Sequence, residues 1–180
     1  QVSTDNFILY TDASKKDSAL LLNQLEIFAA SLKQLTKFPA HAKLPKLTVF
    51  KFTDQQLYQK FVPNSTYRGF YFKAPNGPIA VIAPENGFTV SGLEAAFHEY
   101  VHYFTRAMIS TKQPIWYSEG IAEFFSTMNI EGDKVFIGSI PFSRSQTFRS
   151  RKLLKLETLF NLTTYIDSDD FLIPNATDVL

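Results

Sequence analysis

The apolar positions in the first part of the chain form two kinds of pattern. Phe7–Tyr10 and Leu47–Phe52 are short runs rich in β-forming residues, and each predicts a strand. Between these runs, residues 14–36 predict an amphipathic helix that begins near Asp12 or Ser14 and covers one face of a sheet. The apolar positions of this helix step by four or three residues: Leu21, Leu25, Phe28, Leu32 and Leu35.

The next segment predicts a short helix and a hairpin. Thr53-Asp54 supplies a helix cap, and the helix is expected to end before Pro63. Two further apolar runs, Arg68–Lys73 and Ile79–Ala83, flank the turn-forming sequence Ala74-Pro75-Asn76-Gly77-Pro78. This arrangement is typical of a β-hairpin.

A longer helix is predicted over about residues 92–110. Ser91-Gly92-Leu93-Glu94 has the form of a capping box at its start, and Lys112 and Pro114 mark its end. The apolar stripe of this helix is Leu93, Phe97, Val101, Phe104 and Met108. The order of strand, helix, strand, helix, hairpin and helix predicts an α+β fold, with a mixed β-sheet backed by helices.

The remaining sequence is less strongly patterned. A helix is expected to continue to about Met128, followed by a turn at Glu131-Gly132-Asp133, a strand over Lys134–Ile140 and a helix over Leu153–Leu162. We expect one domain over residues 1–180, with a sheet-containing part (1–90), a helical part (91–128) and a C-terminal part (129–180).

Composition narrows the class of protein. Hydrophobic residues make up 45% of the 180 positions, the net charge is +1, and there is no cysteine. This charge gives no electrostatic reason to expect nucleic-acid binding, and no apolar run is long enough for a membrane span. The first residue is Gln1, as expected for a secreted or periplasmic protein after signal-peptide removal, or for a trimmed chain.

The predicted helix over 92–110 contains the motif His98-Glu99-Tyr100-Val101-His102. Histidines four residues apart lie on one helix face, where both imidazoles can bind one metal ion, usually zinc. Glu99 projects in a different direction and can reach a metal-bound water without being a ligand, as a general base does.

Catalytic zinc sites usually have three protein ligands, so a third is expected elsewhere. Glu119 follows His102 after a turn and would complete a set of two histidines and one glutamate, with the small residues Gly120 and Ala122 allowing close helix approach. His41 is the only other histidine and lies in a predicted loop. A solvated glutamate in the first turn of a helix is the alternative for Glu119.

Glu123 lies one turn after Glu119 on the same predicted helix face. Metal-bound histidines usually give their second N–H to a carboxylate or a carbonyl. We therefore expect Glu123 to orient His98, the alternative being a simple surface glutamate.

The pair of motifs, HEYVH and Pro114-Ile115-Trp116-Tyr117-Ser118-Glu119-Gly120-Ile121-Ala122-Glu123, resembles the gluzincin metallopeptidases. The resemblance is closest to small peptidase MA-like domains and to the catalytic core of aminopeptidase N-type enzymes, and it covers about residues 91–128. It implies a zincin-like fold, zinc bound by His98, His102 and Glu119, and Glu99 as the catalytic carboxylate of a peptide hydrolase.

The resemblance also implies two further features. A tyrosine or histidine commonly helps to stabilise the oxyanion, and Tyr165 is the candidate by its place after the third ligand, ahead of Tyr103 and Tyr117. Extended peptide substrates pair with an edge strand beside the zinc. The candidate strand directly precedes the motif helix and consists of Ile79, Ala80, Val81, Ile82 and Ala83, although a fully buried strand would have the same pattern.

Three functional hypotheses follow from the sequence. The first is an active zinc metallopeptidase acting on a peptide or protein substrate. The second is a catalytically inactive zinc-binding or protein-binding module with the same fold, and the third is an interaction domain without metal. Glu99 favours the first, because a structural zinc site has no need of a general base and usually has four protein ligands.

Overall fold

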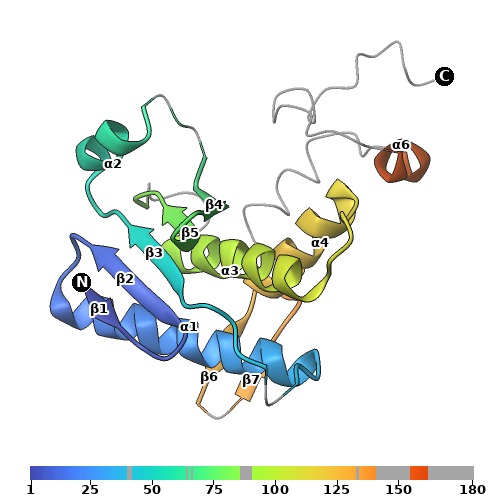
Figure 1. Cartoon of the computed structure of the whole chain (residues 1–180), viewed down its shortest axis with the longest axis horizontal. Helices are drawn as coiled ribbons and strands as arrows, with labels where there is room; N and C mark the ends of the chain where they lie inside the picture. Colours follow the sequence, from blue (N-terminus) through green and yellow to red (C-terminus); the bar gives the residue numbers. More distant parts are fainter. Residues whose placement is uncertain are drawn as a thin grey trace.

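The computed structural model describes residues 1–39, 42–63, 65, 67–85, 91–132, 134–140 and 155–161. These residues form an α+β fold in which a mixed five-stranded sheet is backed by helices (Figure 1). The elements in chain order are β1 (Val2–Ser3), β2 (Phe7–Thr11), α1 (Lys15–Leu35), β3 (Leu47–Lys51), α2 (Gln55–Phe61), β4 (Gly69–Ala74), β5 (Gly77–Ile82), α3 (Gly92–Met108), α4 (Ile115–Ser126), β6 (Asn129–Glu131), β7 (Lys134–Phe136) and α6 (Leu156–Phe160).

The large sheet has the strand order β1-β2-β3-β5-β4. The central strands β2, β3 and β5 are parallel, whereas β1 and β4 pair antiparallel at the two edges. The predicted hairpin is confirmed: β4 and β5 pair in register from Gly69 with Ile82 to Ala74 with Gly77. A second, two-stranded sheet of β6 and β7 follows α4.

The prediction of an edge strand at Ile79–Ala83 is wrong. Residues Gly77–Ile82 form β5, which lies between β3 and β4, and the edge of the sheet on this side is β4. Side chains from Ala80 to Ala83 are buried, because both faces of this central strand are covered. The unbroken apolar run is therefore the pattern of an interior strand.

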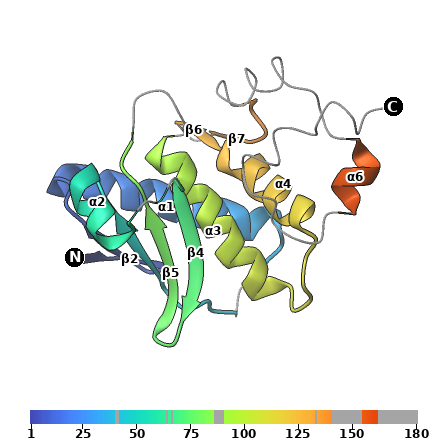
Figure 2. The same ribbon diagram turned by 90° about the horizontal axis from the view of Figure 1, so that it is seen from above.

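Helices α1 and α3 lie together on one face of the sheet (Figure 2). Their shared core includes Phe28 of α1 stacked on Phe97 of α3, with ring centroids 4.0 Å apart, and the edge of Tyr100 against Phe28. The opposite face of the sheet carries a smaller cluster in which Tyr58 of α2 packs with Phe52, Val81 and Ala83. None of the described helices is both long and apolar enough to cross a membrane.

The start of α3 is fixed by polar contacts at the ends of β3 and β5. Ser91 caps the helix, its Oγ accepting a hydrogen bond from the Glu94 N–H, as predicted. The Gly92 N–H donates to Glu85 Oε1, and the buried Lys51 Nζ donates to the carbonyls of Phe52 and Ala83. A Cβ on Gly92 would lie 2.6 Å from Lys51 Nζ and 2.8 Å from Glu85 Oε1, so a side chain at this position would displace the ends of these two side chains.

Most other predicted elements are confirmed with small shifts of their bounds. The helix over 14–36 is α1 with Ser14 as its cap, the short helix capped by Asp54 is α2, and the helix expected to end near Met128 is α4. The strand predicted over Lys134–Ile140 is only β7, and the sequence pattern did not predict its partner β6. Part of the helix predicted over Leu153–Leu162 is α6, and its remaining residues lie outside the described part.

The stacked pair of Phe28 and Phe97 offers a test of this core. Phe28 is fully buried, so we expect Phe28→Ala to lower the free energy of unfolding by about 3–5 kcal/mol through lost burial and a cavity. Urea denaturation followed by circular dichroism measures this. Leu20→Ala is the matched control on the same helix, because Leu20 is 56% exposed, and it should change stability by no more than about 0.5 kcal/mol. Equal losses for the two variants would contradict the packing.

Candidate metal centre

The motif helix α3 brings His98 and His102 together on one face, as their spacing predicts. The two Nε2 atoms are 3.0 Å apart, and both side chains are largely buried. Helix α4 lies against this face and carries Glu119. Glu119 Oε2 is 3.3 Å from His98 Nε2, and Oε1 is 3.4 Å from His102 Nε2.

These residues bring their ligand atoms close enough together to hold one metal ion. The two Nε2 atoms are 3.0 Å apart, and each lies 3.3–3.4 Å from a different oxygen of the Glu119 carboxylate. Two imidazole nitrogens with one carboxylate are a common catalytic zinc set. Among the described residues, His98, His102 and Glu119 form the group of three side chains that could hold a metal ion.

The second nitrogens of the two histidines also have neighbours. Glu123 Oε1 lies 3.6 Å from His98 Nδ1, on the side of the ring away from Glu119, which is where the sequence placed it. Ser118 Oγ lies 3.3 Å from His102 Nδ1. Sequence reasoning missed Ser118, although its position immediately before Glu119 on the same helix was a usable signal.

The charges around His98 favour its protonated form. Burial lowers the pKa of His98, but the hydrogen bond with Glu119 and the negative charges of Glu99 and Glu123 outweigh burial, so the pKa is raised. A cation is therefore stabilised at this position, as expected where carboxylates gather around a histidine. A metal ion would take the place of that proton.

Glu99 follows His98 on α3 and faces the edge strand β4. Its side chain is 7% exposed, and its Cγ would lie 3.1 Å from a Cβ added at Gly69. Burial raises the pKa of Glu99, and the charges of His98 and His102 oppose this effect without cancelling it. A buried carboxylate with a raised pKa, next to a metal-ligating group, has the properties of a general base.

The other predicted site residues divide into two groups. Tyr165 and His41 lie outside the described residues. Tyr103 is buried in the core and donates its hydroxyl hydrogen bond to the Pro45 carbonyl, so it is engaged away from the ligands.

The two small residues after Glu119 behave differently from each other. Ala122 is fully buried against the core, in agreement with the predicted close approach of the helices. Gly120 is exposed, and a Cβ there would meet no atom within 4 Å, so the explanation that Gly120 permits close helix approach is wrong.

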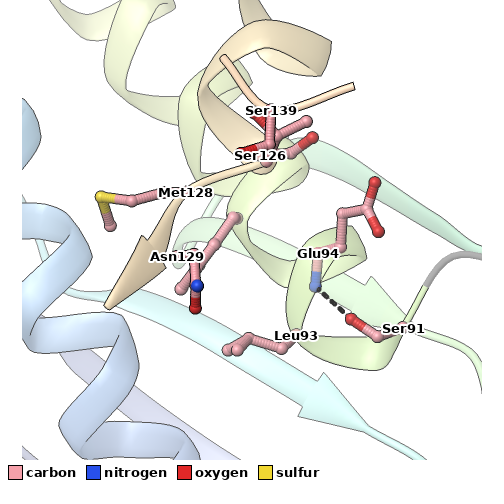
Figure 3. Close-up of a pocket in the computed structure, with 9 residues that line it drawn as sticks. Ser91, Leu93, Glu94, Ser126, Met128, Asn129 and Ser139 are labelled. Carbon is pink, nitrogen blue, oxygen red and sulfur yellow. Dashed lines mark hydrogen bonds between the residues drawn. The ribbon is translucent and has the colours of Figure 1, made fainter. Parts of the chain in front are cut away.

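A separate hollow lies near the first turn of α3 and the end of α4 (Figure 3). Its lining includes Leu93, Glu94, Met128 and Asn129. Glu94 is one turn before His98 along α3, but His98, His102 and Glu119 do not line this hollow. The described residues around it do not include a second metal-ligating group of three.

A comparison with models of protein families and a comparison with curated proteins found no match for this chain.

The positions of Glu119 and Glu123 predict a graded effect on metal binding. Glu119→Ala should abolish stoichiometric zinc binding, as should His98→Ala, because only two ligands would remain. Glu123→Ala should weaken zinc affinity by about ten- to a hundredfold, the usual effect of removing a partner of a ligating histidine. Competition with a fluorescent zinc indicator measures both, and the reverse order of severity would contradict this assignment.

Ser118 should act on the same equilibrium more weakly than Glu119. We expect Ser118→Ala to lower zinc affinity by about tenfold, because His102 would lose the group that holds its Nδ1. The same indicator titration applies, with Ser126→Ala as the control, since the Ser126 hydroxyl donates to the Glu123 carbonyl instead of to a histidine. Unchanged affinity in Ser118→Ala would show that this contact does not orient the ring.

Proposed function

We propose that this protein is a zinc-dependent peptide hydrolase with a zincin-like fold. The observation that carries the proposal is the cluster of ligand atoms from His98, His102 and Glu119, all within 4.8 Å of one another, next to the buried carboxylate of Glu99. The resemblance of the two helical motifs to gluzincin metallopeptidases supports the same function. A bound zinc ion would supply Lewis acidity toward the substrate carbonyl and a water of lowered pKa.

In this reaction Glu99 would act as both general base and general acid. As general base it accepts a proton from the attacking water, and as general acid it gives that proton to the leaving amine. Its burial suits both steps, because a carboxylate with a raised pKa holds the proton more strongly between them. His98 and His102 face Glu119 instead of Glu99, so the base is not consumed as a ligand.

The edge strand β4 is the better candidate for holding an extended substrate. Among the described strands β4 pairs with β5 alone, so its outer edge is available for a further strand. A Cβ added at Gly69, the first residue of β4, would lie 3.1 Å from Glu99 Cγ, so Glu99 reaches this end of the strand. A peptide added along this edge would therefore pass the general base, held mainly through its main chain.

The ligand group has one relatively open side. The Glu119 side chain is 35% exposed, compared with 17% for His98 and 9% for His102. A substrate carbonyl would approach from the exposed side of Glu119, since the two histidines are more deeply buried. An accessible ligand supports a catalytic site, which keeps one coordination position open, over a closed structural one.

The replacement of Glu99 separates metal binding from chemistry. Glu99→Gln should retain the fold and one zinc per chain but lose hydrolysis by about a hundredfold or more, because the base is absent and the ligands remain. Cleavage of a diverse peptide library by the zinc-loaded protein, read by mass spectrometry, gives the activity. Elemental analysis gives the zinc content of both proteins.

Two results would count against this function. Wild-type turnover in Glu99→Gln would show that Glu99 is not the general base. If the zinc-loaded wild-type protein cleaved no peptide in the library, the non-catalytic zinc-binding module would become the better interpretation.

A further inference from the structure

Gly69 opens the edge strand β4 at a point where its backbone does not require glycine. Its φ angle lies outside the left-handed region, so a residue with a side chain could adopt the same conformation. Glycine within a strand costs stability relative to other residues and often marks a close approach of another group. The reason for glycine at this position must therefore be sought in the space around it.

The space beside Gly69 is occupied by Glu99 and Ile82. A Cβ added to Gly69 would lie 3.1 Å from Glu99 Cγ, 3.2 Å from Glu99 Oε1 and 3.2 Å from Ile82 Cδ1. Contacts this short require a neighbour to move by a few tenths of an ångström. Glu99 Cγ and Oε1 therefore occupy the space next to the position where the Cβ of any other residue would lie.

The two neighbours differ in their freedom to move. Ile82 is fully buried within the core, and its backbone is paired with Gly69 across the hairpin. Glu99 approaches this position with its Cγ and with Oε1 at the end of a flexible side chain that extends from α3. A methyl group on Gly69 would consequently push on Glu99 at both atoms, and the carboxylate would have to shift.

We infer that Gly69 is a positioning residue for Glu99: the missing side chain lets the carboxylate lie against the edge strand, next to the path of an added peptide. This inference rests on the proposed hydrolytic function, because it assigns Gly69 a part in placing the general base. Small errors in the placement of reacting groups are costly in enzymes, about a hundredfold for a displacement of 1 Å.

The kinetic test compares Gly69→Ala with the wild-type protein, both loaded with zinc. We expect kcat to fall by about ten- to a hundredfold, with KM changed much less and zinc content still one per chain. Gly120→Ala is the matched control, because it adds the same methyl group beside a ligand where no atom lies within 4 Å. It should leave kcat, KM and zinc content unchanged.

A second test is independent of activity and uses the metal-free proteins. The change in unfolding midpoint caused by Gly69→Ala is measured once in the wild-type background and once in Glu99→Ala. If the added methyl group meets Glu99, its destabilising effect should shrink by half or more when the Glu99 side chain is absent. Gly120→Ala should shift the midpoint equally in both backgrounds.

The outcomes separate this inference from the proposed function. Equal destabilisation by Gly69→Ala in both backgrounds would overturn the inference, as would an unchanged kcat. If Gly69→Ala alone does not fold, recovery of folding in Gly69→Ala/Glu99→Ala supports the inference, and failure of both variants overturns it. An absence of hydrolysis in the wild-type protein would count against the proposed function, and the stability comparison would still decide the role of Gly69.

Discussion

The orientation of α3 about its own axis is the constraint on which the rest of the site depends. One side of the helix buries Phe97, Tyr100 and Phe104 against α1 and the sheet, and the stacking of Phe97 on Phe28 fixes its rotation. With that side held, the 3.6-residue period turns His98 and His102 toward α4 and Glu99 toward β4. A rotation of α3 would move the histidines away from α4 and Glu99 away from β4 at the same time.

The charge balance of the site follows from this arrangement. Three carboxylates, those of Glu99, Glu119 and Glu123, act on the largely buried side chain of His98. Negative groups gathered in this way repel one another unless a cation or a proton is present between them. The raised pKa of His98 is a result of this repulsion, because a proton on His98 lowers it. A divalent cation would neutralise more of the negative charge.

Features encoded locally could be predicted from the sequence, and features that depend on distant contacts could not. The helices and their caps follow from periodic spacing and from Ser14, Asp54 and Ser91, so their bounds were predicted within a few residues. The convergence of His98, His102 and Glu119 was also predictable, because two consecutive helices with a short connection tend to pack together.

The order of the strands was not predictable in the same way. β5 pairs with β3 on one side and β4 on the other, and only the hairpin is a neighbour in sequence. The edge was therefore assigned to the wrong strand, although the unbroken apolar run of β5 was the signal of an interior position. The contact of Gly69 with Glu99 and the bonds of Lys51 join segments about thirty residues apart, and no local pattern indicates them.

The proposed metal ligands and the proposed general base are supported by different parts of the chain, and this division affects how the molecule would unfold. His98, His102 and Glu119 belong to an adjacent helix pair, whereas the wall behind Glu99 is an edge strand paired on one side. Stability is not uniform across a fold, and parts of a structure with few supporting contacts can open before the core does. If β4 opened first, the wall behind Glu99 would be lost while the candidate ligands stayed together. Under the proposed function, hydrolysis would then be lost at a lower denaturant concentration than zinc binding, and a sample with full zinc content would already be inactive.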